Sequence, residues 1–356
     1  MSNLFSVVAV LAILSGPLFA VDGREKQTPD RYQQALNLLQ SARTIRNADD
    51  RNKQIDRAQK VLEQLVTKNG KHPQFAQANA QLAQILLGKA RVLLWHSESA
   101  TDADRKMQDR QQARKLLRNA RTYFQVAHDL SKKQFNEFPV FIDRQTDPDK
   151  FAARRSAEIA FIRAQLDLAL CDFEEGHTYE ETDPKFKTFL GNAAAAFEKI
   201  HNKYRSLVVG LYARLYQAKC FQETGEVRKA LGIYNKLLSH PAGSSTTMQT
   251  LQDQARQFRL ICLNHDQRKD YVLAIGEAEN WLETAKERSQ TTTGLGIRWE
   301  LALAQEQRSK QTDVPEAERK QLLQRALENA RLIARFTGRY KAKTLAMIAR
   351  LSTADE

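Results

Sequence analysis

Apolar residues follow helical spacing along most of the chain. They recur three and four positions apart, as in Ala35, Leu38, Leu39 and Ala42, with charged residues between them. This spacing puts the apolar side chains on one face of a helix. Strand-like runs of Val, Ile and Thr are missing from these stretches, so we expect about twelve helices and no sheet.

Proline marks several of the expected helix starts, because a proline in the first helical turn gives up no hydrogen bond. These starts are Thr28-Pro29, His72-Pro73, Asp147-Pro148, Asp183-Pro184 and Val314-Pro315. The Thr and Asp residues before proline are also good helix N-caps. Glycine (14) and proline (8) are sparse overall, and the composition favours helix.

A period of 42 residues runs through the last third of the chain. Cys220, Cys262 and Ala304 follow one another at this interval, and each lies in the middle of an apolar helical pattern. Small residues at a fixed place let two helices approach closely, which stacked helical hairpins require. We expect repeats at about 211–241, 255–285 and 295–336.

The first of these units is similar to a tetratricopeptide repeat. The family's order of small, aromatic, turn glycine, bulky, alanine, aromatic and terminal proline is matched by Ala218, Phe221, Gly225, Val227, Ala230, Tyr234 and Pro241. The second unit has Ala274 and Trp281 at similar places, but Lys269 stands where the turn glycine should be. The third has Ala326 and Ala330 after a longer turn. The overall texture also resembles exported repeat proteins of planctomycete bacteria.

The resemblance implies an all-α fold over residues 146–351, a right-handed α-solenoid of antiparallel helical hairpins. In that family the first helix of each pair faces the concave side. Residues 28–145 are expected to form helical hairpins, either degenerate repeats or a separate bundle. A linker is expected near 134–149, where Phe135, Phe138 and Phe141 interrupt the helical rhythm and should dock on neighbouring helices.

The first twenty residues resemble a secretory signal. An apolar run from Leu4 to Leu14 is followed by Ser15, Gly16 and Pro17, and it is too short for a transmembrane helix of ~20 residues. We expect cleavage after Ala20 and export to the periplasm or cell envelope. An uncleaved membrane anchor is the alternative, since no Lys or Arg precedes the run.

No motif in the chain predicts catalysis. The zinc pattern His-Glu-x-x-His, Cys-x-x-Cys, Gly-x-Ser-x-Gly and a phosphate loop are all missing from the sequence, so we expect no enzyme, no cofactor and no metal. We interpret Cys171, Cys220 and Cys262 as small buried thiols, while a disulfide between Cys220 and Cys262 stays open. The acidic residues around Gly176-His177 fit a solvated loop better than a cation site.

The charge of +13, from 55 Lys and Arg against 42 Asp and Glu, favours anionic partners. For an exported protein these are acidic proteins, anionic lipid or envelope polymer rather than nucleic acid. We expect a scaffold that binds a peptide or partner protein on a concave helical surface. The alternative is a membrane-tethered structural component of an envelope assembly, with membrane contact only through an uncleaved N-terminal segment.

Four cations are candidates for the partner-binding surface: Lys219, Arg256, Arg259 and Arg298. Arg256 and Arg259 are three apart and share a helix face, and Arg298 follows Arg256 by 42 residues. The common register predicts a row of cations that captures carboxylates of a partner. The alternative is ion pairing on neighbouring turns, with Glu300, Asp266 or Asp253.

Overall fold

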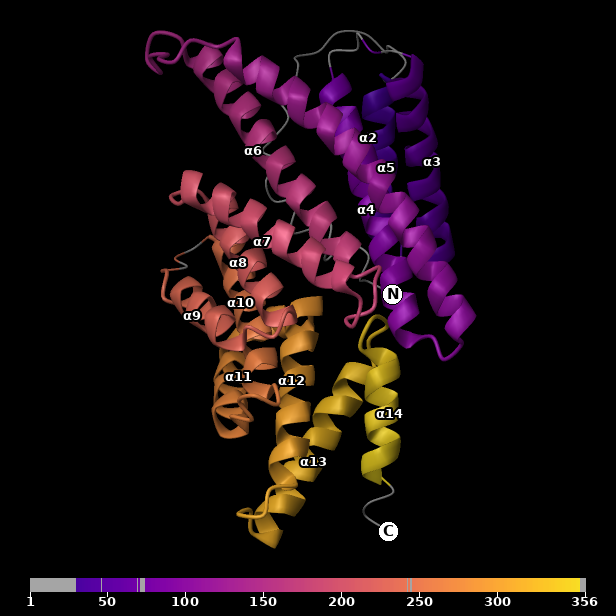
Figure 1. Cartoon of the computed structure of the whole chain (residues 1–356), viewed down its shortest axis with the longest axis vertical. Helices are drawn as coiled ribbons and strands as arrows, with labels where there is room; N and C mark the ends of the chain where they lie inside the picture. Colours follow the sequence, from indigo (N-terminus) through magenta and orange to yellow (C-terminus); the bar gives the residue numbers. More distant parts are fainter. Residues whose placement is uncertain are drawn as a thin grey trace. The chain divides into compact units, whose positions relative to one another are not determined.

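The structure, a computed structural model, describes residues 30–352 apart from 46, 69, 71–73, 242 and 244. Within these residues the chain forms thirteen α-helices, one short 3-10 helix and no strand, which confirms the all-helical expectation (Figure 1). None of the described helices is both long and apolar enough to cross a membrane. The predicted signal and the starts Thr28-Pro29 and His72-Pro73 lie outside the described residues.

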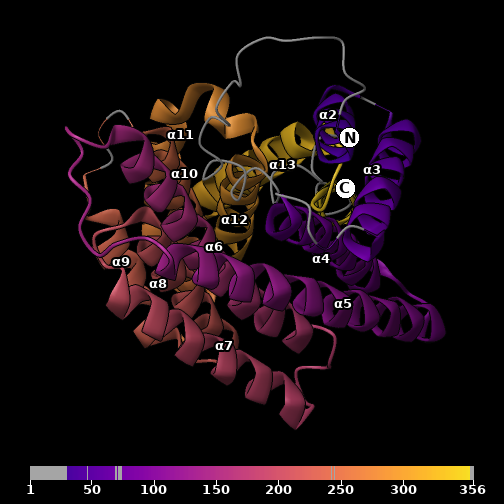
Figure 2. The ribbon, with the colours of Figure 1, turned by 90° about the horizontal axis from the view of Figure 1, so that it is seen from above.

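Contacts divide the described chain into two units, with the division between Tyr204 and Arg205. The N-terminal unit contains α2 (Arg31–Thr44), α3 (Ala48–Lys68), α4 (Phe75–Ser99), α5 (Ala103–Asn136), α6 (Pro148–Gly176) and α7 (Pro184–Lys203). Each of these helices packs on the next one in the chain, and α2 to α5 lie side by side (Figures 1 and 2). The sequence suggested a linker near 134–149, whereas α6 packs along α5 and both belong to this unit.

One apolar cluster of the N-terminal unit reaches from α2 to α6. Its largest fully buried side chains include Leu62, Leu82, Leu117 and Phe124, and α6 contributes the buried Cys171. Phe135 is held by a stacked contact with Phe161 of α6, as expected for an aromatic of this segment. Phe141 differs from the expectation, because 81% of its surface is exposed.

The C-terminal unit contains α8 (Val208–Glu223), α9 (Val227–Leu238), α10 (Thr246–Asn264), α11 (Tyr271–Ala285), η1 (Lys286–Gln290), α12 (Thr292–Ser309), α13 (Glu316–Ala334) and α14 (Lys341–Ser352). Successive helices pack on one another, and α10 also packs directly on α8 and on α12. Figures 1 and 2 show α10 beside α11 and α12.

Several helices begin where the sequence places a cap or a proline. Pro148 and Pro184 open α6 and α7, and Pro315 directly precedes α13. The carboxylate of Asp183 accepts a hydrogen bond from the Lys185 backbone N–H at 2.9 Å, whereas Asp147 makes no such bond. Asp147 therefore ends the loop before α6 without serving as the predicted cap.

The turns after α8 and α10 share an unusual backbone conformation. Gly225 has a φ of +86°, and Lys269, at the place where the repeat pattern expects glycine, has a φ of +50°. L-residues avoid this left-handed region because the side chain approaches the carbonyl oxygen. The second turn thus adopts the glycine conformation without glycine, which is why the sequence pattern looked broken there.

Candidate partner-binding face of the C-terminal unit

Alternate helices of the C-terminal unit carry small buried residues at the 42-residue interval. We call α8, α10 and α12 the first helices and α9, α11 and α13 the second helices, by their order along the chain. The small residues Cys220, Cys262 and Ala304 are at most 1% exposed, and each lies on a first helix. Burial raises the pKa of the Cys262 thiol to about 12, and all three cysteines are free, so these groups act as packing residues.

A hydrogen bond recurs at the same interval as the small residues. In the amide orientation that satisfies both of its polar atoms, Gln222 of α8 donates to the Phe258 carbonyl oxygen of α10 at 3.3 Å. Asn264 of α10 donates to the Glu300 carbonyl oxygen of α12 at 2.9 Å. Donors and acceptors are each 42 residues apart. The two contacts between first helices therefore share one register.

Arg259, expected on a binding surface, instead ties α10 to two second helices. Its Nε donates to the Asn235 side chain of α9 at 2.7 Å, and its guanidinium pairs with Glu277 of α11. Only 14% of the Arg259 side chain is exposed. Arg256 is half-buried and makes no hydrogen bond or ion pair to the described residues, and burial lowers its pKa. Carboxylates near it are Glu277 and Asp253.

Arg298 follows the same trend. It donates to the Asn329 side chain of the second helix α13 at 2.9 Å, and burial lowers its pKa. Arg259 and Arg298 thus face second helices and not a common open row. Asp253, one of the acidic residues predicted to pair with these arginines, has other partners. It accepts hydrogen bonds from Arg288 and from the Trp281 ring N–H, both at 2.7 Å. The 42-residue spacing predicts that these arginines occupy equivalent positions on their helices. It does not predict which side of each helix packs against the second helices.

Lys219 is the predicted cation that lies between first helices. Its Nζ is 4.7 Å from the centre of the Phe258 ring of α10 and 3.1 Å from the Glu223 carboxylate of its own helix. A cation over an aromatic face is favourable when partly desolvated, and this side chain is 15% exposed. Lys219 therefore has a neighbour that the sequence reasoning did not identify.

Phe258 belongs to a stripe on α10 that we call the α10 stripe: Gln254, Phe258 and Ile261. Positions i, i+4 and i+7 share one helix face. The polar contacts of α10 to α9 and α11 come from other positions, Gln252, Asp253 and Arg259. The Phe258 ring also packs against α9, with its centre 6.1 Å from that of Tyr234. The stripe is half-buried and combines an amide, an aromatic ring and a branched aliphatic side chain.

Two side-chain polar atoms of the first helices, 42 residues apart in the sequence, are buried without a hydrogen-bond partner among the described residues. They are the side-chain oxygen of Gln254 and the hydroxyl of Tyr212, which precedes Gln254 by 42 residues. Burial raises the pKa of Tyr212, so its hydroxyl stays protonated and able to donate. Buried polar atoms normally find a partner, so these two keep hydrogen-bonding capacity that the described residues do not use.

Glu300 lies near the stripe, on α12, and is buried. Its side chain accepts a hydrogen bond from Asn264 at 3.0 Å, and 8% of the residue is exposed. Burial raises its pKa to about 7, although the Asn264 hydrogen bond and the charges of Lys219, Lys343 and Arg339 act in the opposite direction. This carboxyl therefore changes its charge near neutral pH.

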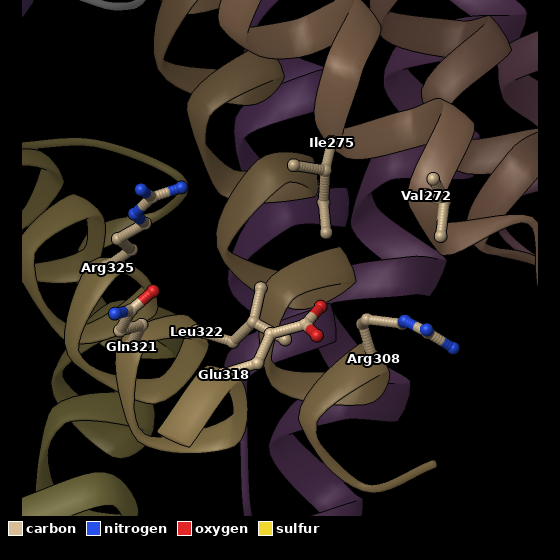
Figure 3. Close-up of a pocket in the computed structure, with 7 residues that line it drawn as sticks. All are labelled: Val272, Ile275, Arg308, Glu318, Gln321, Leu322 and Arg325. Atoms are coloured by element: carbon tan, nitrogen blue, oxygen red, sulfur yellow. The ribbon is translucent and has the colours of Figure 1, made fainter. Parts of the chain in front are cut away.

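A pocket lies between α11, α12 and α13. Ile275 and Val272 of α11 face Leu322 and Glu318 of α13 across it (Figure 3). Its rim is completed by Arg308, Gln321 and Arg325. The 64% exposed Val272 makes this pocket a second place for an apolar contact.

The acidic segment of the N-terminal unit forms ion pairs instead of a cation site. Glu174 forms an ion pair with Arg91 of α4 at 2.6 Å, and Asp172 pairs with Arg121 of α5. The Glu175 carboxylate lies 3.5 Å from the Arg121 guanidinium. Among the described residues no three His, Cys, Asp or Glu side chains are placed to hold a metal ion. Arginines of α4 and α5, far from this segment in the sequence, neutralise it, which a reading of the loop alone could not reveal.

Sequence reasoning missed Gln254, Phe258 and Tyr212, although their spacing carried a signal. The i, i+4, i+7 pattern of the α10 stripe and the 42-residue step from Tyr212 to Gln254 were both visible. The candidates chosen by charge, Arg256 and Arg259, lie on another side of the same helix. No protein-family model matches the chain, and no curated protein matches it either.

Proposed function

We propose that the C-terminal unit is a non-enzymatic scaffold that binds a peptide or a segment of a partner protein along the α10 stripe and Lys219. The observation that carries this proposal is the pair of buried, unpartnered polar atoms on Gln254 and Tyr212, together with the half-buried ring of Phe258. An extended peptide offers backbone donors and acceptors for such atoms.

The scaffold is a solenoid of helical hairpins similar to tetratricopeptide repeats. Three features support it: direct packing between first helices, one hydrogen-bond register from α8 to α12, and the shared left-handed turns at Gly225 and Lys269. Repeats of this kind expose a continuous row of first helices to a ligand. The proposal includes export, with the mature chain starting near Val21, which N-terminal sequencing of the exported protein tests.

The chemistry of the stripe favours a partner segment with one apolar and one acidic side chain. Phe258 and Ile261 supply apolar contact, and Lys219 supplies a cation already held over the Phe258 ring. Lys219 also pairs with Glu223, so an incoming carboxylate competes with a residue of the same helix. Such competition makes the acidic contact weaker than the apolar one.

Affinity capture from the native envelope, followed by titration of the captured protein against variants, tests this function. Phe258→Ala and Tyr212→Phe remove an apolar contact and a single hydroxyl, and each should weaken binding, the first by at least tenfold. Val272→Ala, on the pocket of Figure 3, is the matched control and should leave affinity unchanged. Loss of binding only in Val272→Ala would move the site to that pocket, and unchanged binding in all three folded variants would refute both surfaces.

A further inference from the structure

Helix α14 of the C-terminal unit carries apolar residues on two opposite faces. On one face, Met347 and Leu351 are buried in a cluster with residues of α12 and α13. The other face is exposed, and its apolar residues follow the helical spacing i, i+3, i+4 and i+7. We call them the α14 stripe: Ala342, Leu345, Ala346 and Ala349. A surface helix normally keeps its outer face polar, so the stripe departs from the usual pattern.

Cations border the α14 stripe on both sides. With about 3.6 residues per turn, Lys341 lies on one side of the stripe, and Lys343 and Arg350 lie on the other. Leu345, in the middle of the stripe, is 50% exposed. An apolar stripe between Lys and Arg side chains is typical of helices that lie in the interface of a bilayer, where the long basic side chains reach the headgroups.

More cations gather where α13 ends and α14 begins, and Figure 1 shows the two helices side by side. Five of them are exposed: Arg331, Arg335, Arg339, Lys341 and Lys343. Leu332, in the last turn of α13, adds a 38% exposed apolar side chain to this end of the hairpin. Between Glu328 and Asp355 the sequence contains six Lys and Arg and no Asp or Glu.

The carboxylates of neighbouring helices leave this surface positive. On α12, the Glu306 side chain is 2% exposed and pairs with Arg350 at 2.8 Å. Glu300, also on α12, is 8% exposed. On α13, Glu328 is exposed one turn before the first of the five cations. Five exposed cations against this one exposed carboxylate leave an excess of four positive charges on the described surface.

We propose that the α14 stripe lies in the interfacial region of an anionic lipid bilayer, with the exposed cations of the α13–α14 hairpin on the headgroups. Charge complementarity favours this occupant, because a second copy of the chain would bring like charges together. A bilayer covers a short apolar stripe without a matched surface, whereas a stable protein interface needs about 1,000 Å² or more of complementary surface. The contact uses neither the α10 stripe nor the N-terminal segment.

The first test places an environment-sensitive dye on the α14 stripe of the full chain. The three native cysteines are at most 1% exposed, so a thiol introduced by Leu345→Cys is labelled selectively in the folded protein. Thr312→Cys, exposed in the turn at the other end of α13, is the matched control. With vesicles of phosphatidylcholine and phosphatidylglycerol, the dye at 345 should shift to the blue and brighten several-fold, and the dye at 312 should change little.

Two outcomes of the dye experiment would overturn the proposal. One is a chain that does not sediment with the anionic vesicles. The other is a chain that sediments while the dye at 345 keeps its aqueous spectrum, because another segment or charge attraction alone would then make the contact. An equal response to vesicles of phosphatidylcholine alone would refute the role of anionic lipid.

A second test reverses two cations that form no ion pair or side-chain hydrogen bond with the described residues, Arg335 and Lys341. Arg335→Glu with Lys341→Glu should weaken binding to the anionic vesicles at least tenfold, with the helical circular dichroism spectrum unchanged. Lys236→Glu with Lys320→Glu makes the same change in net charge at exposed positions of α9 and α13 and should weaken binding much less. Equal losses in the two folded double variants would show that net charge, and not this surface, attracts the chain to lipid.

Discussion

The two units of this chain are built from similar helices but are held together differently. In the N-terminal unit, α5 and α6 run for 34 and 29 residues, and ion pairs such as Arg91 with Glu174 join them to each other and to α4. No described helix of the C-terminal unit exceeds 19 residues, and hydrogen bonds from side-chain amides join its first helices.

The difference shows two ways to fix the register of neighbouring helices. A long apolar seam tolerates a shift by one turn, so paired charges at defined places select one alignment in the N-terminal unit. In the C-terminal unit, amide hydrogen bonds from Gln222 and Asn264 to the next first helix recur 42 residues apart and fix one alignment. A recurring hydrogen bond of this kind suits a repeat, because every copy can use the same contact.

The largest effect is expected from breaking an ion pair of the N-terminal unit. Only 13% of the Arg91 side chain and 12% of Glu174 are exposed, so Arg91→Ala leaves a poorly solvated carboxylate. We expect a loss of about 3–5 kcal/mol in the stability of this unit, measured by native-state hydrogen exchange of α4 and α6.

Arg155→Ala is the matched control for that pair. Its partner Glu158 lies one turn away on the same helix, and 47% of the Arg155 side chain is exposed, so the expected loss is below about 1 kcal/mol. Arg91→Met combined with Glu174→Met should recover most of the loss, because no charge is then left buried. Similar exchange rates for Arg91→Ala and Arg155→Ala would show that apolar packing alone holds the N-terminal unit.

The next effect concerns pH and the C-terminal unit. Burial raises the pKa of Glu300 to about 7 from its ordinary value of 4.5, so the folded state keeps a proton that the unfolded state releases. Stability from this group is present below pH 4.5, falls as the pH rises towards 7, and stays lost above that. At 1.36 kcal/mol per pKa unit the loss is roughly 3 kcal/mol.

Glu300→Gln removes this titration and keeps an acceptor for Asn264. The variant should be more stable than the parent at pH 8 and similar to it at pH 4.5, as read from hydrogen exchange of α12 at the two values. A pH dependence that is identical in both proteins would show that Glu300 does not titrate in this range.

The smallest effect tests the left-handed turn. Lys269 has a φ of +50°, a conformation that glycine adopts without steric cost, so Lys269→Gly should stabilise the C-terminal unit by about 0.5–1 kcal/mol in urea unfolding. Gly225→Ala, at φ +86°, should destabilise it by a similar amount. A loss of stability in Lys269→Gly would mean that the lysine side chain contributes more than its backbone strain costs.

Helix content and several helix starts were predictable because they depend on local spacing. Pro148 and Pro184 open helices as predicted, and the small residues of the 42-residue pattern are buried. The candidate site was not predictable to the same degree. Arg256 and Arg259 share a helix face, but the position of α9 and α11 around α10 decides whether that face is open.

The sequence by itself determined the helices, their 42-residue register and the excess of positive charge, because each depends on residue type and on spacing within one segment. Only the tertiary structure decided which charged side chains pair within the protein. Arg91 pairs with Glu174, which is 83 positions away, and Arg259 pairs with Glu277 on the next helix, whereas Phe141 stays 81% exposed. Such partners lie on separate helices, and their distances follow from how the helices pack, which the spacing within one segment does not specify.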